Sequence, residues 1–205
     1  LEDEYVKIKS IYKQLKDILS KRIILLDGAY GTAIQQYNLS EKDFRGTLLA
    51  NQSKPLIGNN DLLVLTNPDI VVEIHESYLE SGCDILSTNT FSSTKIAQSD
   101  FGTEDLCKEL NFHGASLARK TADRFSSEEK PIFVAGSLGP TNRTASLSPD
   151  VNKPGFRNVS FDDLHESYSE AMQALVDGGV DFFLIETIFD TLNAKAAIAA
   201  AHNIN

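Results

Sequence analysis

The sequence predicts an α/β fold around a parallel sheet, and it favours a (β/α)8 TIM barrel over an open doubly wound sheet. Short apolar segments alternate with longer helical ones, the order of βαβ units with right-handed crossovers. The apolar segments are hydrophobic throughout, as strands buried on both faces are. The predicted helix-to-strand joins (SGCDIL, GGVDFF) are short. The strand-to-helix joins are long and irregular, and a barrel places its variable functional loops there.

Polar residues at the end of each predicted strand are the second argument for a barrel. An open sheet concentrates its site at one switch point, whereas here all four strand ends carry polar groups. They are Asp27, Thr88–Asn89–Thr90, Gly139–Pro140–Thr141 and Glu186–Thr187.

The first 22 residues predict an amphipathic helix. Ile8, Ile11, Leu15 and Ile18 or Leu19 recur at helical spacing. The segment is too charged for the apolar stretch of a signal peptide. We expect residues 1–21 to form an N-terminal helix that packs one face on the barrel.

Four strands and four helices follow. The predicted strands are residues 23–27, 84–91, 131–139 and 181–187, and the predicted helices are residues 68–81, 104–125, 161–177 and 190–202. Pro68 suits a first helical turn, and Asp190 or Thr191 suits an N-cap. A (β/α)8 barrel needs about 250 residues. We therefore expect residues 22–205 to be the N-terminal half of a barrel, four βα units that end in mid-domain.

Two long connections interrupt this alternation, residues 29–67 and residues 139–160. Long loops inside compact domains are usually functional or disordered. Because both follow predicted strands, at the presumed active face, function is the favoured interpretation.

Composition narrows the class of protein. The formal net charge is −10 and the sequence pI is about 4.8, which argues against a nucleic-acid or anionic-membrane surface. Two cysteines without CxxC spacing suggest free thiols in a reducing compartment. No apolar run approaches the roughly 20 residues of a membrane span. We expect a cytoplasmic protein with neither nucleic-acid nor membrane partners.

The segment LLDGAYGT places an acid at the mouth of a glycine turn. It matches neither GxxxxGK[ST] nor GxGxxG, and Asp27 would repel a phosphate. One interpretation is structural, with Asp27 capping the turn and Gly28 supplying an unusual backbone angle. The other is a carboxylate aimed at a cation or an amine, with Gly28 letting the ligand approach the backbone.

Glu186 ends another apolar strand, DFFLIE, at the position that corresponds to Asp27. In a barrel both acids would face one mouth. Two carboxylates without Lys or Arg in either motif suggest an ammonium group, a metal, or an acid–base pair. The structural alternative is a salt bridge to Arg143 or Arg157 from the long loop.

A complete metal site is not expected in these residues. All four histidines fall in predicted helices, away from the mouth: His75, His113, His165 and His202. Cys83 lies at the opposite end of its strand, and Cys107 lies in a helix. For the same reason, and without GxSxG, a Ser-His-Asp hydrolase is disfavoured. Thr88, Asn89 and Thr90 offer hydroxyls and an amide for a small ligand, or for turn structure.

Four motifs together resemble the homocysteine-binding module of cobalamin-dependent methionine synthases, within the homocysteine methyltransferase family. They are LLDGAYGT, DILSTNTF, VAGSLGPTNRTASLSPD and LIETIFDTLNAKAA, and DFRG, GNNDLL and FRN lie between them in the expected order. The similarity runs over residues 22–201.

This resemblance implies a (β/α)8 barrel that binds homocysteine and a catalytic zinc. Asp27 and Glu186 match the acids that hold the substrate's amino group, and Gly28 with Thr88, Asn89 and Thr90 match positions around its amino-acid end. The complete enzyme would transfer a methyl group from methylcobalamin, recharged by methyltetrahydrofolate on separate folate- and cobalamin-binding modules, to a zinc-bound homocysteine thiolate.

One departure from the family pattern concerns the zinc. The family's three zinc thiolates come from later strands, and neither Cys83 nor Cys107 matches them. We therefore expect no metal ligands in this chain, zinc thiolates beyond Asn205, and an inactive isolated fragment. The alternatives are a betaine- or S-methylmethionine-type homocysteine methyltransferase, or a non-catalytic amino-acid-binding domain.

Overall fold

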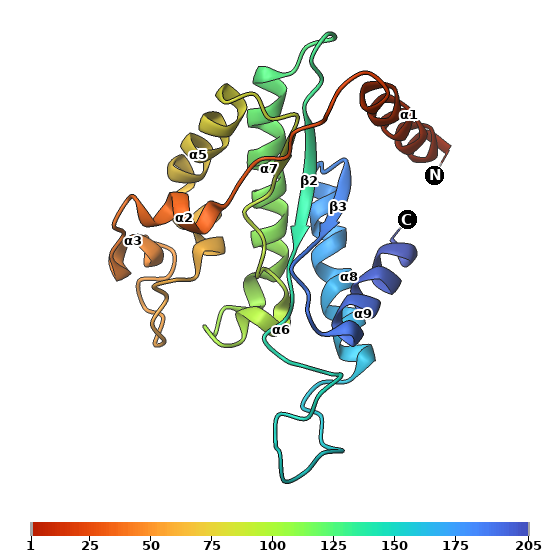
Figure 1. The fold of residues 1–205 in the computed structure, drawn as a ribbon. Coiled ribbons are helices and arrows are strands. Elements are labelled where there is room, and N and C mark those ends of the chain that lie inside the picture. Colours follow the sequence, from red (N-terminus) through yellow and green to blue (C-terminus); the bar gives the residue numbers. More distant parts are fainter. Residues whose placement is uncertain (1, 205) are drawn as a thin grey trace.

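A parallel sheet runs through the centre of the molecule (Figure 1). The computed structural model describes residues 2–204. Strands β1 (Ile85–Ser87), β2 (Phe133–Leu138) and β3 (Phe182–Ile185) pair in the order β1-β2-β3. A single parallel bridge from Leu26 to Ile85 adds the preceding segment beside β1. Parallel neighbours in chain order confirm the predicted βαβ arrangement.

Long helices flank the sheet, and short ones fill the connections. The long helices are α1 (Glu2–Leu19), α5 (Pro68–Glu80), α7 (Cys107–Phe125), α8 (Phe161–Gly178) and α9 (Thr191–Asn203). The short ones are α2 (Tyr30–Gln35), α3 (Glu41–Arg45), η1 (Asn60–Leu62), α4 (Leu63–Thr66), α6 (Lys95–Gln98) and η2 (Glu104–Leu106).

The predicted helices are confirmed, with small differences at their ends. Pro68 stands in the first turn of α5, and Asp190 caps α9 by accepting the Asn193 N–H at 2.9 Å. The helix predicted over 104–125 begins with a 3-10 turn before α7. All three strands are shorter than predicted, and β1 loses most, because Thr88, Asn89 and Thr90 leave the ladder at its carboxyl end.

The first predicted strand, residues 23–27, is wrong as a buried strand. It forms only the Leu26 bridge, and Ile23 and Leu25 are 79% and 52% exposed. Its apolar sequence predicts burial on both faces, but within residues 2–204 it has a neighbouring strand on one edge alone. β2, with neighbours on both edges, is buried along its whole length.

The main core lies between the sheet and helices α7, α8 and α9. Leu86, Val134 and Leu138 of the strands pack with Tyr168, Met172 and Leu175 of α8. α8 contacts both α7 and α9, and in Figure 1 α7 and α8 run alongside β2. A second cluster lies under the 29–67 connection, where Leu62 and Leu63 pack with α5. This connection is therefore a folded layer of the domain.

The amino ends of β1 and β3 share one arrangement, which explains the similar SGCDIL and GGVDFF joins. Asp84 accepts the Leu25 N–H at 2.9 Å and pairs with Arg22 at 2.7 Å. Asp181 accepts the Val134 N–H at 2.8 Å and pairs with Arg119 at 2.9 Å. Each acid ties its own strand to the preceding one, so these acids hold the sheet at the end away from the site.

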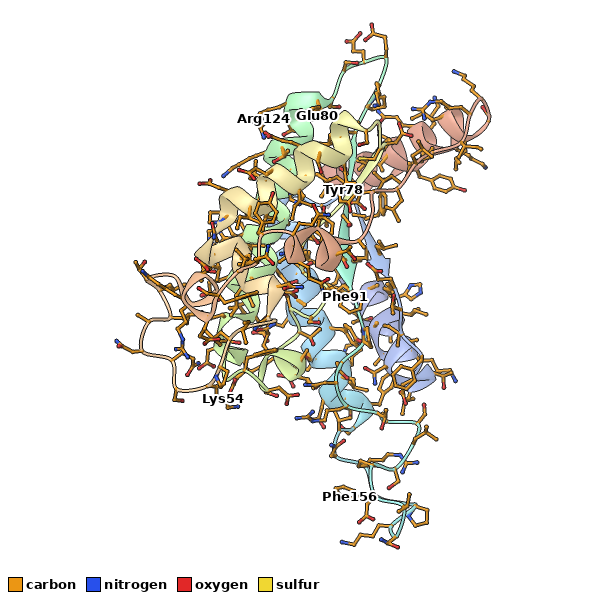
Figure 2. All side chains as sticks on the ribbon, turned by 60° about the vertical axis from the view of Figure 1, so that its left-hand side comes forward. Lys54, Tyr78, Glu80, Phe91, Arg124 and Phe156 are labelled. Carbon is orange, nitrogen blue, oxygen red and sulfur yellow. The ribbon has the colours of Figure 1, made fainter. Side chains whose placement is uncertain are left out.

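The second long connection, residues 139–160, protrudes from the carboxyl end of the sheet (Figure 1). The Arg157 guanidinium closes its base by donating to the carbonyls of Ala145, Ser146, Pro154 and Phe156. Figure 2 shows Phe156 near the tip of this loop. At the other end of the molecule, α1 stands apart from the long helices, and its packing on a barrel stays a prediction. None of the helices within residues 2–204 is long and apolar enough to cross a membrane.

Candidate functional site

A cavity of about 410 Å³ lies at the carboxyl end of the sheet. Its size falls in the range of small-molecule pockets. Its walls come from the turn before α2, the segment around η1, the residues that follow β1, and the end of β3. The lining includes Gly28, Tyr30, Asp61, Ser87, Asn89, Ser137 and Glu186. Of the predicted polar strand ends, Thr88, Asn89 and Glu186 line this cavity, whereas Asp27 and Gly139–Pro140–Thr141 do not.

Asp27 sits behind this cavity and is bonded to two residues that line it. Its Oδ2 accepts the Ser87 N–H at 2.7 Å and the Tyr30 hydroxyl at 2.9 Å, and the Ser87 Oγ lies 2.9 Å from both carboxylate oxygens. The carboxylate therefore fastens the first segment to β1. Burial raises the pKa of Asp27, although the bonds from Ser87 and Tyr30 act in the opposite direction.

Glu186 reaches the same cavity from the end of β3. Its Oε1 accepts the Ser137 hydroxyl of β2 at 2.8 Å. The charge of Glu186 is close enough to raise the pKa of Asp27. Among residues 10–204, whose side chains are described, no ion pair includes either acid. Arg143 pairs with Asp100 and Arg157 bonds to carbonyls, so neither neutralises the acids.

The backbone after Glu186 is strained. Thr187 has a φ of +56°, a conformation that β-branched residues rarely adopt. Such strain costs about 1–3 kcal/mol and concentrates at functional sites. Here it accompanies the turn that ends β3 directly after the acid.

Of the three residues after β1, Thr88 and Asn89 line the cavity, whereas Thr90 does not. The hydroxyls of Thr88 and Thr90 lie 2.6 Å apart and bond to the backbone of Ser137, at 2.9 Å each. They therefore hold β1 to β2. Asn89 donates from Nδ2 to the Asn60 carbonyl at 2.9 Å and lines the cavity.

Gly28 lines the cavity and also meets a neighbouring ring. A Cβ at this position would lie 2.9 Å from the ring of Tyr78, which bonds through its hydroxyl to the Ala29 carbonyl at 3.0 Å. Figure 2 shows Tyr78 beside α2 in the middle of the molecule. A larger residue at position 28 would therefore have to displace the end of the Tyr78 side chain.

Asp61 is a third acid of the cavity, and sequence reasoning missed it. It is 4% exposed, and its Oδ2 accepts the Ser92 N–H at 2.6 Å and the Ser93 hydroxyl at 2.7 Å. Burial raises its pKa to about 6. The only available signal was its place in GNNDLL, inside a connection that carried no strand-end pattern.

Asp61→Asn should change how stability depends on pH. Because the folded pKa of about 6 exceeds the ordinary 3.8, the stability that protonated Asp61 provides is complete below pH 3.8 and lost as the pH rises through 6. Asparagine keeps an acceptor and does not titrate. Relative to wild type, the variant should gain about 2–3 kcal/mol between pH 4 and pH 8 in urea unfolding. Exposed Asp105→Asn is the control, and an equal pH profile in both variants would contradict the burial argument.

The partners of the acids, Ser87, Ser137 and Tyr30, were also missed as site residues. Ser87 and Ser137 occupy the inner face at the ends of β1 and β2, one step along the sheet from each acid. Alternation of side chains in a strand was the signal that could have found them. Tyr30 stands three residues after Asp27, in LLDGAYGT, as the first residue of α2, and its hydroxyl reaches back to the acid.

Taken together, the fold and the cavity define an α/β protein with a small-molecule site at the carboxyl end of a parallel sheet, and its acids suit a cationic group. The chain belongs to the homocysteine S-methyltransferase family, whose sequence model matches residues 24–205.

Solved structures of one family member share the fold. The homocysteine methyltransferase MmuM from Escherichia coli, in its metallated form, matches with a TM-score of 0.68 and 23% identity over 93% of this chain and 64% of that one. The oxidized form matches with a TM-score of 0.67 and 22% identity, over 93% of this chain and 63% of that one. The apo form matches with a TM-score of 0.59 and 21% identity, over 89% of this chain and 56% of that one. The chain thus spans less than two thirds of the length of the structures it matches.

Proposed function

We propose that this chain forms the homocysteine-binding part of an enzyme that methylates the homocysteine sulfur to give methionine. The observation that carries the proposal is the pair of acids, Glu186 in the cavity wall and Asp27 behind it, without a cationic partner within residues 10–204. Two such carboxylates are costly to keep ionised together unless a cation joins them. The ammonium group of an amino acid is such a cation, and family membership favours homocysteine as its carrier.

In this proposal the acids bind and orient the substrate and perform no bond-making step. The two carboxylates accept hydrogen bonds from the ammonium group, and Asn89 lies near enough in the cavity wall to contact the amino-acid end. The sulfur then extends toward the open side of the cavity, where the methyl donor would reach it. Orientation of a nucleophile contributes to rate by reducing the entropy cost of the reaction.

The described residues do not fit the zinc that the family resemblance implies. Both cysteines are buried, and burial raises the pKa of Cys83 to about 11 and of Cys107 to about 12, which opposes the thiolate that zinc needs. Cys107 donates to the Ser93 carbonyl. No three His, Cys, Asp or Glu side chains in the described part of the chain cluster as metal ligands. We therefore derive no step through a metal.

The half-barrel prediction is part of this proposal. The exposed apolar residues of the first segment, Ile23, Leu25 and Leu26, support further strands that cover them in the complete protein. Residues 22–205 would then be four of eight βα units, with residues 1–21 as an added helix. The cobalamin- and folate-binding modules are proposed on the resemblance of the long motifs to methionine synthases. A cytoplasmic location is proposed on the acidic composition and the cysteine pattern.

The proposal is tested by titrating the complete protein with L-homocysteine and with 4-mercaptobutanoate, which lacks the amino group. The amine should strengthen binding by about 100-fold, because its loss leaves two acids unpaired. Equal affinities would reject the ammonium site. Activity with methylcobalamin would support a methionine synthase. Activity with betaine or S-methylmethionine, or binding without methylation, would support the alternatives.

A further inference from the structure

The hydroxyl of Tyr30, at the start of α2, lies between two acceptors. It is 2.9 Å from the Asp27 Oδ2 and 2.8 Å from the Ser87 carbonyl oxygen. A phenol has one proton to donate. An ionised carboxylate is the stronger acceptor, so the bond goes to Asp27 when that acid is charged.

The two oxygens of Asp27 are unequally occupied. Oδ2 accepts from the Tyr30 hydroxyl and the Ser87 N–H and also faces the Ser87 hydroxyl, whereas Oδ1 faces the Ser87 hydroxyl alone. Oδ2 is therefore the anchored oxygen. Oδ1 keeps unused acceptor capacity for a ligand.

We propose that Tyr30 is a positioning residue: its hydroxyl anchors Oδ2 of Asp27, keeps the carboxylate ionised, and leaves Oδ1 to receive the substrate's ammonium group. This inference rests on the proposed function for the identity of the ligand. The geometric part of the inference, that Tyr30 controls the Asp27 carboxylate, is independent of the proposed function.

The ring of Tyr30 is held independently of its hydroxyl. Two rings of α5 pack against it, His75 edge-on at 5.6 Å and Tyr78 tilted at 6.0 Å between centroids. His75 is fully buried with neither ring nitrogen bonded, and burial lowers its pKa to about 3. The His75 ring is therefore uncharged and contacts Tyr30 through packing alone. Removing the hydroxyl alone should leave this packing in place.

Among residues 10–204, the titratable groups that face Asp27 carry no positive charge. They are Tyr30 from α2, Tyr78 from α5, Cys83 before β1 and Glu186 after β3. Glu186 favours the protonated form of Asp27, and so does burial. Donors to the carboxylate therefore decide whether it is charged. The Tyr30 hydroxyl is one of the few such donors.

Tyr30→Phe should raise the pKa of Asp27, because a donor to the charged form is lost. Since the ammonium group needs an ionised acid, the acidic limb of homocysteine binding should move up by about one pH unit. At pH values below the pKa of Asp27, the homocysteine affinity of the variant should therefore be about tenfold lower than that of wild type. A 3,5-difluorotyrosine at position 30, a stronger donor with the same ring, should move the limb the other way. A merely structural role for Tyr30 would produce neither shift.

The experiment uses the complete protein with two readouts, the carbon-13 titration of the Asp27 carboxyl without ligand and the homocysteine affinity against pH. Tyr37→Phe is the matched control, since the Tyr37 hydroxyl also donates to a carboxylate, the exposed Glu73, at 2.9 Å. Equal carboxyl titrations in the Tyr30→Phe and Tyr37→Phe proteins would overturn the inference. If wild type binds no homocysteine, the proposed function fails, and the carboxyl titration still decides the role of Tyr30.

Discussion

Asp27→Asn is expected to weaken homocysteine binding by about 100-fold in the complete protein. The substitution removes one of the two charges that face the ammonium group. It also replaces one acceptor oxygen by an N–H₂ group, which cannot accept a hydrogen bond from the Ser87 N–H or from the ligand's ammonium group. Breaking one partner of a hydrogen-bonded charge pair costs about 2–5 kcal/mol, and 100-fold corresponds to about 2.7 kcal/mol. Calorimetric titration at pH 7.5 gives the affinity.

Two further variants make this result specific. Glu186→Gln should weaken homocysteine binding in the same direction, while exposed Asp105→Asn should leave it unchanged. The double variant Asp27→Asn, Glu186→Gln should lose less than the sum of the two single losses, because both acids act on one group. Unchanged affinity in both single variants would remove the ammonium role from these acids.

Much of the site could be predicted because parallel strands end at the same edge of a sheet. Asp27 and Glu186 stand at equivalent points of two apolar segments, so their approach at one end of the sheet, with Glu186 in the cavity wall and Asp27 behind it, follows from strand order. The helices could be predicted for a similar reason. The N-cap Asp190 and the first-turn Pro68 are local signals, and each marks the start of a helix without reference to tertiary contacts.

The hydrogen-bond partners could not be predicted in this way. Whether Ser87 or Thr88 faces the acid depends on the register of β1, and a shift of one residue exchanges the two faces. The observed register turns Ser87 to Asp27, and the Thr88 hydroxyl accepts the Ser137 N–H. Asp61 was missed because its connection folds into short helices, whose packing on α5 and α7 is not periodic in sequence.

The first segment shows the limit of hydropathy. The residues of IILLD indicate burial, and in the described chain three of them are about half or more exposed: Ile23, Leu25 and Leu26. Hydropathy shows that a segment favours burial, but whether its side chains are buried depends on the strands that pair beside it. The exposed edge therefore supports further strands in the complete protein, as proposed above.

The close contact between α7 and α8 makes the stability of the protein sensitive to a substitution at Gly178. Gly178 ends α8 directly against α7. A Cβ there would lie 2.5 Å from the Cβ of Ala115 and 2.6 Å from the Phe112 carbonyl oxygen. The second obstacle is backbone, so the clash is relieved only if one helix moves. Overpacking of this kind costs about 1–3 kcal/mol, occasionally more, and the contact lies in the largest core cluster.

Gly178→Ala should therefore destabilise the protein by about 3 kcal/mol in urea unfolding, even though alanine is the better helix former by about 1 kcal/mol. The matched control is Gly155→Ala in the protruding loop, where a Cβ meets nothing within 4 Å. That variant should be neutral or slightly stabilising, because alanine restricts the unfolded chain. Equal stabilities for the two variants would show that α8 can move off α7 at little cost. The core that supports β2, and with it Ser137 beneath Glu186, would then be looser than its packing indicates.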